Sequence, residues 1–126
     1  MIARSHRTYL SRLAVLAGLA FGPAVPLTAH AATIGVNSFV DAVVDDGNCT
    51  LREALVAANE NHAVDGCAAG VPGHDQIVLP AGTYALVDGT RGDLDVADDL
   101  LLTGASSAST TIDAAALGDR VLHVVS

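Results

Sequence analysis

The segment from Cys49 to Asn59, which reads CTLREALVAAN, constrains the fold of this chain most because it predicts a short helix with a defined start. Thr50 precedes the apolar run and Glu53 follows three residues later. This is the spacing of a capping box, in which each side chain accepts a hydrogen bond from the other residue's backbone N–H. A helix of about three turns is marginal in water on its own. We therefore expect it to be stabilised by packing against another part of the chain.

Apolar residues of this helix recur at positions i, i+3, i+4 and i+7, which places them on one stripe. They are Leu51, Ala54, Leu55 and Ala58. The polar residues that lie outside the stripe are Arg52, Glu53, Asn59 and Glu60. We expect Leu51 and Leu55, the largest side chains on the stripe, to carry the packing, and Arg52 to contribute far less to stability.

Short β-branched and apolar runs make up most of the remaining chain. Residues 33–44 predict one strand or two short ones before the helix. Further short strands are predicted at Gln76–Leu79, Thr83–Val87, Asp93–Val96, Leu100–Thr103, Thr110–Asp113 and Arg120–Val125. The turns between them are too short to hold crossover helices. The sequence therefore predicts an all-β fold with a single short helix.

The spacing of these strands indicates how they stack. Strands centred near Val78, Leu101 and Leu122 recur at intervals of about 23 and then about 21 residues, in the range typical of a solenoid. Parallel stacking of successive coils is the expected arrangement. A β-sandwich is the alternative, since evenly spaced short strands also suit that fold. Against it, no tight two-residue hairpin turns join matched strands.

Residues 1–31 have the three parts of a secretory signal peptide. A basic start is followed by the apolar run Leu13–Leu27 and by Ala29-His30-Ala31, a small-x-small cleavage pattern. A transmembrane anchor is the weaker alternative because Gly22-Pro23 breaks the run, which falls short of the roughly 20 residues that a span needs. We predict cleavage after Ala31, export to the medium, the cell surface or the periplasm, and no membrane span in the mature chain. Mass spectrometry of the exported product should place its first residue near Ala32.

Charge excludes one large class of partners. The mature chain keeps three arginines against 14 carboxylates, a formal charge of −11, and has no lysine. Such a surface repels phosphate backbones and anionic lipids, so nucleic-acid binding is excluded. Phe39 and Tyr84 are the only aromatic residues after residue 31, so the core must be aliphatic.

Cys49 and Cys67 are an even pair of cysteines in a chain predicted to be exported, which favours a disulfide. The bridge would close a loop around the helix. The alternative is a pair of free buried thiols, as a reducing compartment would favour. A redox role is not indicated, since no Cys-x-x-Cys motif is present.

Four carboxylates form the densest acidic cluster in the sequence. They are Asp93, Asp95, Asp98 and Asp99. Two interpretations stay open: a calcium site, because Ca²⁺ prefers oxygen ligands, or the solvent-facing side of a strand and its turns. The histidines at positions 62, 74 and 123 have no short metal-ligand spacing. No catalytic residue and no cofactor other than calcium is indicated.

Several sequence blocks recur in the order found in one family. They are VNS at 36–38, DDG at 45–47, CTLREALVAAN at 49–59, DQIVLPAGTY at 75–84, GDLDV at 92–96, TTID at 110–113 and DRV at 119–121. Together they resemble the CSLREA-type N-terminal domain of secreted bacterial right-handed parallel β-helix proteins. Thr50 stands where the family motif has Ser, which keeps the helix cap. The resemblance implies the start of a right-handed parallel β-helix, a solenoid, with one N-terminal capping helix.

The resulting division of the chain is a signal peptide (1–31), an N-terminal strand and capping helix with a disulfide loop (32–74), and the first coils of a β-helix (75–126). The predicted function is a non-catalytic capping module of an exported surface or secreted protein. The leading end of a β-helix polysaccharide lyase or hydrolase and a calcium-binding surface module are the alternatives. Expected partners are further coils or a second copy at the apolar C-terminal strand. A carbohydrate or surface ligand stays open.

Overall fold

The computed structural model describes residues 18, 22–23 and 31–125. The predicted signal peptide, 1–31, and its cleavage therefore lie almost wholly outside the described residues. Within that described part, no helix is both long enough and apolar enough to cross a membrane.

The described chain is mostly β, with one short helix. The helix α1 spans Leu51–Glu60, as the capping box and the apolar stripe predicted. The strands are β1 (Thr33–Gly35), β2 (Asp75–Leu79), β3 (Gly82–Ala85), β4 (Leu94–Val96), β5 (Leu100–Gly104), β6 (Thr110–Asp113) and β7 (Leu122–Val124). The strands after the helix lie within one to two residues of their predicted positions.

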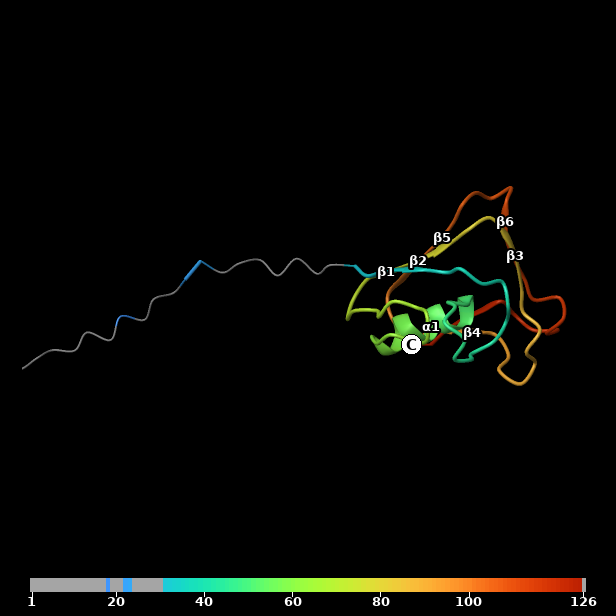
Figure 1. Ribbon diagram of the computed structural model, residues 1–126, viewed down its shortest axis with the longest axis horizontal. Helices are drawn as coiled ribbons and strands as arrows, with labels where there is room; N and C mark the ends of the chain where they lie inside the picture. The colour runs from blue at the N-terminus through green and yellow to red at the C-terminus, as the bar shows by residue number, and fades with distance from the viewer. Residues whose placement is uncertain (1–17, 19–21, 24–30, 126) are drawn as a thin grey trace, which may run out of the picture.

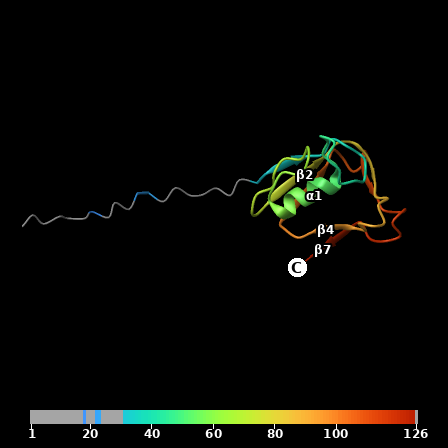
Figure 2. The same cartoon turned by 60° about the horizontal axis from the view of Figure 1, so that its bottom comes forward.

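All pairs between these strands are parallel. They form a three-stranded sheet in the order β1-β2-β5 and two two-stranded sheets, β3-β6 and β4-β7. Figure 1 shows β1, β2 and β5 side by side along one flank, with β3 and β6 together on another. In Figure 2, β4 and β7 lie side by side below α1. Parallel pairing contradicts the sandwich alternative, which is built from antiparallel sheets.

Each strand from β2 to β4 pairs with the strand three elements later. The registers join Asp75 to Leu100, Gly82 to Thr110 and Leu94 to Leu122. Paired strands are thus 25 to 28 residues apart along the chain. We call β2, β3 and β4 the first layer and β5, β6 and β7 the second layer. The predicted spacing was wrong for its last member: Leu122 stacks on β4, not on the sheet that contains Val78 and Leu101. The loops differ in length, so equal spacing along the chain does not identify stacked strands.

The predicted strand at 33–44 is also shorter than expected. Only Thr33–Gly35 pairs as a strand, with β2, and Ser38 makes one isolated bridge to Thr50. After Gly35 the segment makes side-chain contacts in place of strand pairing. Asn37 Oδ1, for example, accepts a hydrogen bond from Cys49 N at 2.7 Å. β propensity alone therefore overestimated the strand.

The core lies inside the first layer and becomes shallower in the second. Inward side chains of β2 to β4 and the following residues are at most 2% exposed: Ile77, Leu79, Tyr84, Leu86 and Leu94. The register partners of Ile77, Tyr84 and Leu94 are more open: Leu102 and Ile112 are half-buried, and Leu122 is 39% exposed. Burial therefore falls from the N-terminal face of the stack to the C-terminal face.

Candidate functional site: the N-terminal cap

Strands β2, β3 and β4 use one edge to pair with β5, β6 and β7. Their opposite edges form the N-terminal face of the stack. We call residues 32–74, which lie over that face, the N-terminal cap. β1 covers the edge of β2 by ordinary strand pairing. Side chains of the cap contact β3 and cover the edge of β4, as described below.

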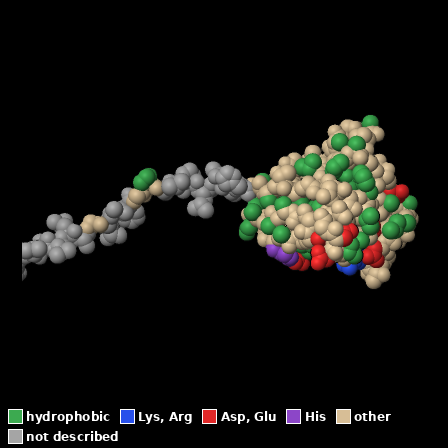
Figure 3. Space-filling view, viewed as in Figure 1, with side chains coloured by type: hydrophobic (Ala, Val, Ile, Leu, Met, Phe, Trp, Pro, Cys, Tyr) green, Lys and Arg blue, Asp and Glu red, His purple; other side chains and the backbone are tan. Residues whose placement is uncertain are grey.

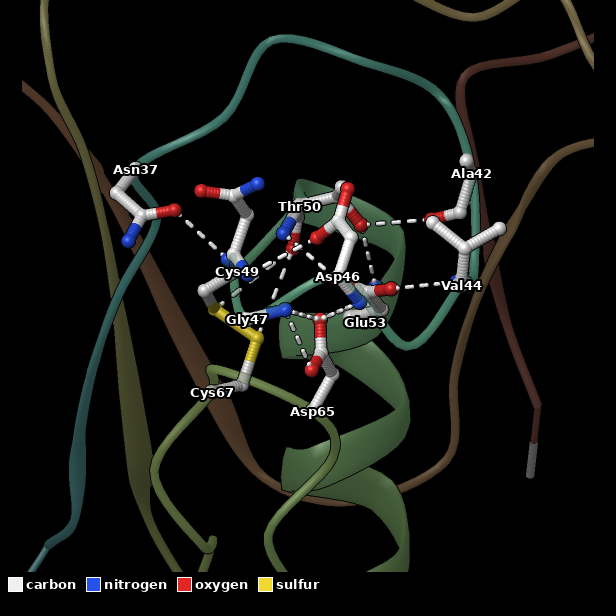
Figure 4. Close-up of a disulfide and its surroundings, with 11 residues drawn as sticks. Asn37, Ala42, Val44, Asp46, Gly47, Cys49, Thr50, Glu53, Asp65 and Cys67 are labelled. Carbon is white, nitrogen blue, oxygen red and sulfur yellow. Dashed lines mark hydrogen bonds between the residues drawn. A yellow bond between two sulfur atoms is a disulfide. The ribbon is translucent and has the colours of Figure 1, made fainter.

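The predicted capping box starts α1 and is confirmed. Glu53 N donates to Thr50 Oγ1 at 3.1 Å, and Thr50 N donates to Glu53 Oε2 at 2.9 Å (Figure 4). Both side chains also reach back to the preceding segment. Thr50 Oγ1 donates to Ala42 O at 2.7 Å, and Glu53 Oε1 accepts from Val44 N at 2.8 Å. The box therefore joins the helix to residues 42–44 as well as capping it.

The apolar stripe of α1 is buried as predicted. Its residues are at most 3% exposed: Leu51, Ala54, Leu55 and Ala58. Two polar residues outside the stripe are also buried, since Arg52 and Glu53 are 6% and 0% exposed. Both side chains form hydrogen bonds inside the cap. The apolar pattern of the helix does not predict such contacts. The stripe thus describes only part of the buried surface of α1.

Leu55→Ala is expected to lower the free energy of unfolding by about 2 to 3 kcal/mol, the lower part of the range for buried leucines. Leu55 is 2% exposed but also borders a surface cleft of about 350 Å³ between α1 and β4, so the site can partly relax. Urea denaturation followed by circular dichroism measures the loss. Val56→Ala, on the half-buried side of the same helix, is the control and should cost less. Equal small losses for both variants would contradict packing through Leu55.

The predicted disulfide joins Cys49 to Cys67 and is confirmed. Both half-cystines are buried, at 0% and 2% exposure, beside the start of α1 (Figure 4). The loop is held a second time by Asp65, whose carboxylate accepts hydrogen bonds from Gly47 N at 2.9 Å and Asp46 N at 3.1 Å. Desolvation opposes the charge of Asp65, but these N–H donors outweigh it and lower its pKa.

Arg52 and Asp41 form a buried ion pair that connects the helix to the first layer. Arg52 Nε donates to Asp41 Oδ1 at 2.6 Å and Nη2 to Oδ2 at 3.2 Å, and the two side chains are 7% and 1% exposed. Asp41 Oδ2 also accepts from Val87 N and Asp88 N, both at 2.7 Å. The carboxylate therefore caps the backbone that leaves β3.

Asp41 has a lowered pKa, so its contribution to stability depends on pH. Burial alone would raise the pKa, but the hydrogen bond from Arg52, the N–H groups of Asp88 and Val87, and the charge of Arg52 outweigh burial. A carboxylate with a lowered pKa in the folded state stabilises the fold above its unfolded-state pKa, here 3.8. That stabilisation is lost as the pH falls below this value through the folded-state pKa.

Asp41→Asn is accordingly expected to destabilise the protein clearly at pH 7 and much less at pH values well below 4, where the wild-type carboxyl is protonated. Urea midpoints of both proteins over this pH range measure the difference. Asp113→Asn, at an exposed position on β6, is the control and should cost little at pH 7. A difference for Asp41→Asn that stays constant with pH would contradict the assignment.

The edge of β4 is covered by two side chains of α1. Asn59 Nδ2 donates to Asp95 O and its Oδ1 accepts from Ala97 N, both at 2.9 Å. Arg52 Nη2 donates to Gly92 O at 3.0 Å. These contacts satisfy the backbone groups that a neighbouring strand would otherwise use, so α1 takes the place of a strand beside β4.

Phe39 packs against β3. A Cβ atom at Gly82 would collide with the Phe39 ring, so only glycine allows this approach. The ring also lies 5.0 Å from the ring of Tyr84, centroid to centroid, with the planes tilted by 47°. Phe39 is nevertheless 50% exposed. It packs as a cover on the outside of the layer rather than as part of the core.

The structure divides the four carboxylates of the predicted calcium cluster. Asp93 and Asp95 lie together with His123. Asp98 Oδ2 instead lies 3.4 Å from Asn61 Nδ2, and Asp99 Oδ2 lies 3.4 Å from His74 Nδ1. Figure 3 shows acidic, arginine and histidine side chains gathered at the edge of the molecule near α1 and β4. A single site made of all four carboxylates is therefore not what the structure shows.

Two residues of the cap were not indicated by the sequence. Asp41 lies in an apolar run with no motif around it, and Asn59 was recognised only as lying outside the stripe. Comparison with known proteins finds no match to a family model, to a curated protein or to a solved structure. The functional argument therefore depends on the geometry of the cap itself.

Proposed function

We propose that this chain is the N-terminal capping module, with the first coils, of an exported right-handed parallel β-helix protein, and that its role is structural rather than catalytic. One observation carries the proposal: residues 32–74 cover the edges of β2 and β4 on the N-terminal face and pack over β3 and the backbone that follows it. β1 pairs with β2, Phe39 packs against Gly82 of β3, and Asp41 accepts hydrogen bonds from Val87 N and Asp88 N just after β3. Arg52 and Asn59 bind backbone groups along β4.

Covering these edges has a direct physical purpose. An unpaired strand edge presents a row of N–H and C=O groups to which another chain can pair. The terminal repeats of a solenoid therefore need a cap that differs from the internal repeats. A buried ion pair, a side-chain amide and an aromatic ring satisfy or shield these groups without offering a new strand edge. The cap thus supports growth of the stack in one direction.

The opposite face supports the same proposal. β5, β6 and β7 pair on one edge in the described residues, and their inward side chains are more exposed than those of the layer beneath. Further parallel coils, or a second copy of the chain, would cover them. The right-handed sense follows from the strong preference of parallel crossover connections. A disulfide of buried half-cystines fits an oxidising, extracytoplasmic compartment.

Light scattering during size-exclusion chromatography of the processed protein tests this asymmetry between the two faces. We expect concentration-dependent association at high micromolar protein, and we expect Val124→Lys to abolish it, because a lysine on an edge strand opposes pairing. Val40→Lys is the matched control: Val40 is 63% exposed in the cap and Val124 is 72% exposed on β7.

The effects of the two variants on association distinguish the two faces. Association that survives Val40→Lys but not Val124→Lys supports a sealed N-terminal face and an open C-terminal face. A monomer at all concentrations would show that the C-terminal face is closed and would overturn the proposed direction of growth. Loss of association in Val40→Lys would show that the cap itself is an interface, which contradicts its role as a terminus.

A further inference from the structure

A second site lies on the outer surface of the β4-β7 sheet. Asp93 and Asp95 flank the buried Leu94, so their side chains point away from the core on the same side of the chain. His123 on β7 is the direct register partner of Asp95. Three metal-ligating side chains from two successive layers therefore meet on one outward face.

The geometry of this group is compact. One ligand atom from each of Asp93, Asp95 and His123 lies within 4.8 Å of the others, and His123 Nδ1 lies 3.0 Å from Asp95 Oδ1. Asp93 is the least exposed of the three, and its Oδ2 atom is a buried atom whose one ion-pair partner among the described residues is Arg120 Nε at 3.0 Å.

We propose that Asp93, Asp95 and His123 bind a divalent transition-metal ion of the zinc class. An imidazole nitrogen with two carboxylate oxygens is a ligand set that Zn²⁺ accepts, whereas Ca²⁺ prefers oxygen ligands alone. With Zn–N and Zn–O bonds of about 2.0 to 2.2 Å, tetrahedral ligand atoms lie roughly 3 to 3.5 Å apart. The His123–Asp95 distance fits this value, and a small rotation of Asp93 brings in the third ligand.

Arg120 determines whether the third ligand is free to bind. Its side chain is 59% exposed and lies near two carboxylates, with Nε 3.0 Å from Asp93 Oδ2 and 3.6 Å from Asp119 Oδ1. A cation at the site would repel the guanidinium, which can move to Asp119 without losing an ion pair. Arg120→Ala is therefore expected to strengthen metal binding. If Arg120 were instead needed to order the site, the same variant would weaken metal binding.

Binding would join the two layers at their most exposed sheet. All three residues of β7 are exposed, so this strand has little core packing to hold it. An ion held by Asp93 and Asp95 from one layer and His123 from the next would fix β7 to β4. Because such an ion binds only the folded chain, it raises stability as its concentration rises above the dissociation constant.

Isothermal titration of the untagged, chelator-treated protein with zinc chloride tests the proposal. We expect one equivalent to bind and the melting temperature to rise by on the order of 10 °C when free zinc exceeds the dissociation constant about 100-fold. Calcium chloride should give neither effect. His123→Ala and Asp95→Asn should each weaken binding at least about tenfold, in line with the loss of a ligand.

Two other histidines provide matched controls. His62 and His74 each lie 3.4 Å from a single carboxylate, and both are exposed. His62→Ala and His74→Ala should leave zinc binding unchanged. The proposal is overturned if these variants weaken binding as much as His123→Ala does, if calcium binds as tightly as zinc, or if no equivalent binds. Far-ultraviolet circular dichroism checks that each variant is folded. If His123→Ala does not fold, the zinc affinity of Asp95→Asn tests the proposal in its place.

Discussion

Arg52→Ala is expected to lower the free energy of unfolding by about 3 to 5 kcal/mol, because removing one partner of a buried ion pair leaves the other charge buried without compensation. The Asp41 side chain is only 1% exposed and would keep its two backbone N–H donors but lose both contacts with the guanidinium. The carbonyls of Gly92 and Asp93, at the edge of β4, would lose their donors as well.

Urea denaturation at pH 7 measures this loss. Arg91→Ala is the matched control, since Arg91 pairs with Asp88 at 3.1 Å but is 48% exposed. Exposed ion pairs contribute about 0 to 1 kcal/mol, so the control should be almost unchanged. If both arginine variants lost the same small free energy of unfolding, Arg52 would be a surface residue in solution. The cap would then not be attached to the first layer as described.

Cys67→Ser should lower the free energy of unfolding by about 3 kcal/mol, because the bridge, with a sequence separation of 18 residues, no longer restricts the entropy of the unfolded chain. A domain of this size buries a limited core and depends strongly on such a cross-link. The melting temperature should therefore fall by more than about 10 °C. The cap should be destabilised more than the rest of the fold, because the bridge holds residues 61–67 against the start of α1.

Differential scanning calorimetry of the oxidised protein and the variant measures this fall. Ala68→Ser is the control, because Ala68 is the exposed neighbour of Cys67 and receives the same new hydroxyl. It should melt within a degree or two of the wild type. Unchanged melting of Cys67→Ser, or two titratable thiols in the native wild type, would show that the bridge does not stabilise the cap.

Local features of this fold were accessible from the sequence because they depend on residues close together in the chain. The capping box needs only Thr50 and Glu53, three residues apart, and the apolar stripe needs only one helix. The short strands were located by their apolar runs and by the Gly and Pro residues between them. Pairing of the two cysteines followed from their number in a chain predicted to be exported. Each of these inferences uses short-range geometry or composition.

The tertiary structure alone decided which strands stack and how the first layer is closed. Loops of unequal length shifted β7 onto β4, although spacing along the chain had assigned it to another sheet. Arg52 is charged and lies outside the apolar stripe, so it was expected to contribute far less to stability than Leu51 and Leu55. Its partner Asp41 is 11 residues away and its carbonyl partners at Gly92 and Asp93 are 40 and 41 residues away. Burial of a charge depends on partners brought together by folding, and no local pattern records them.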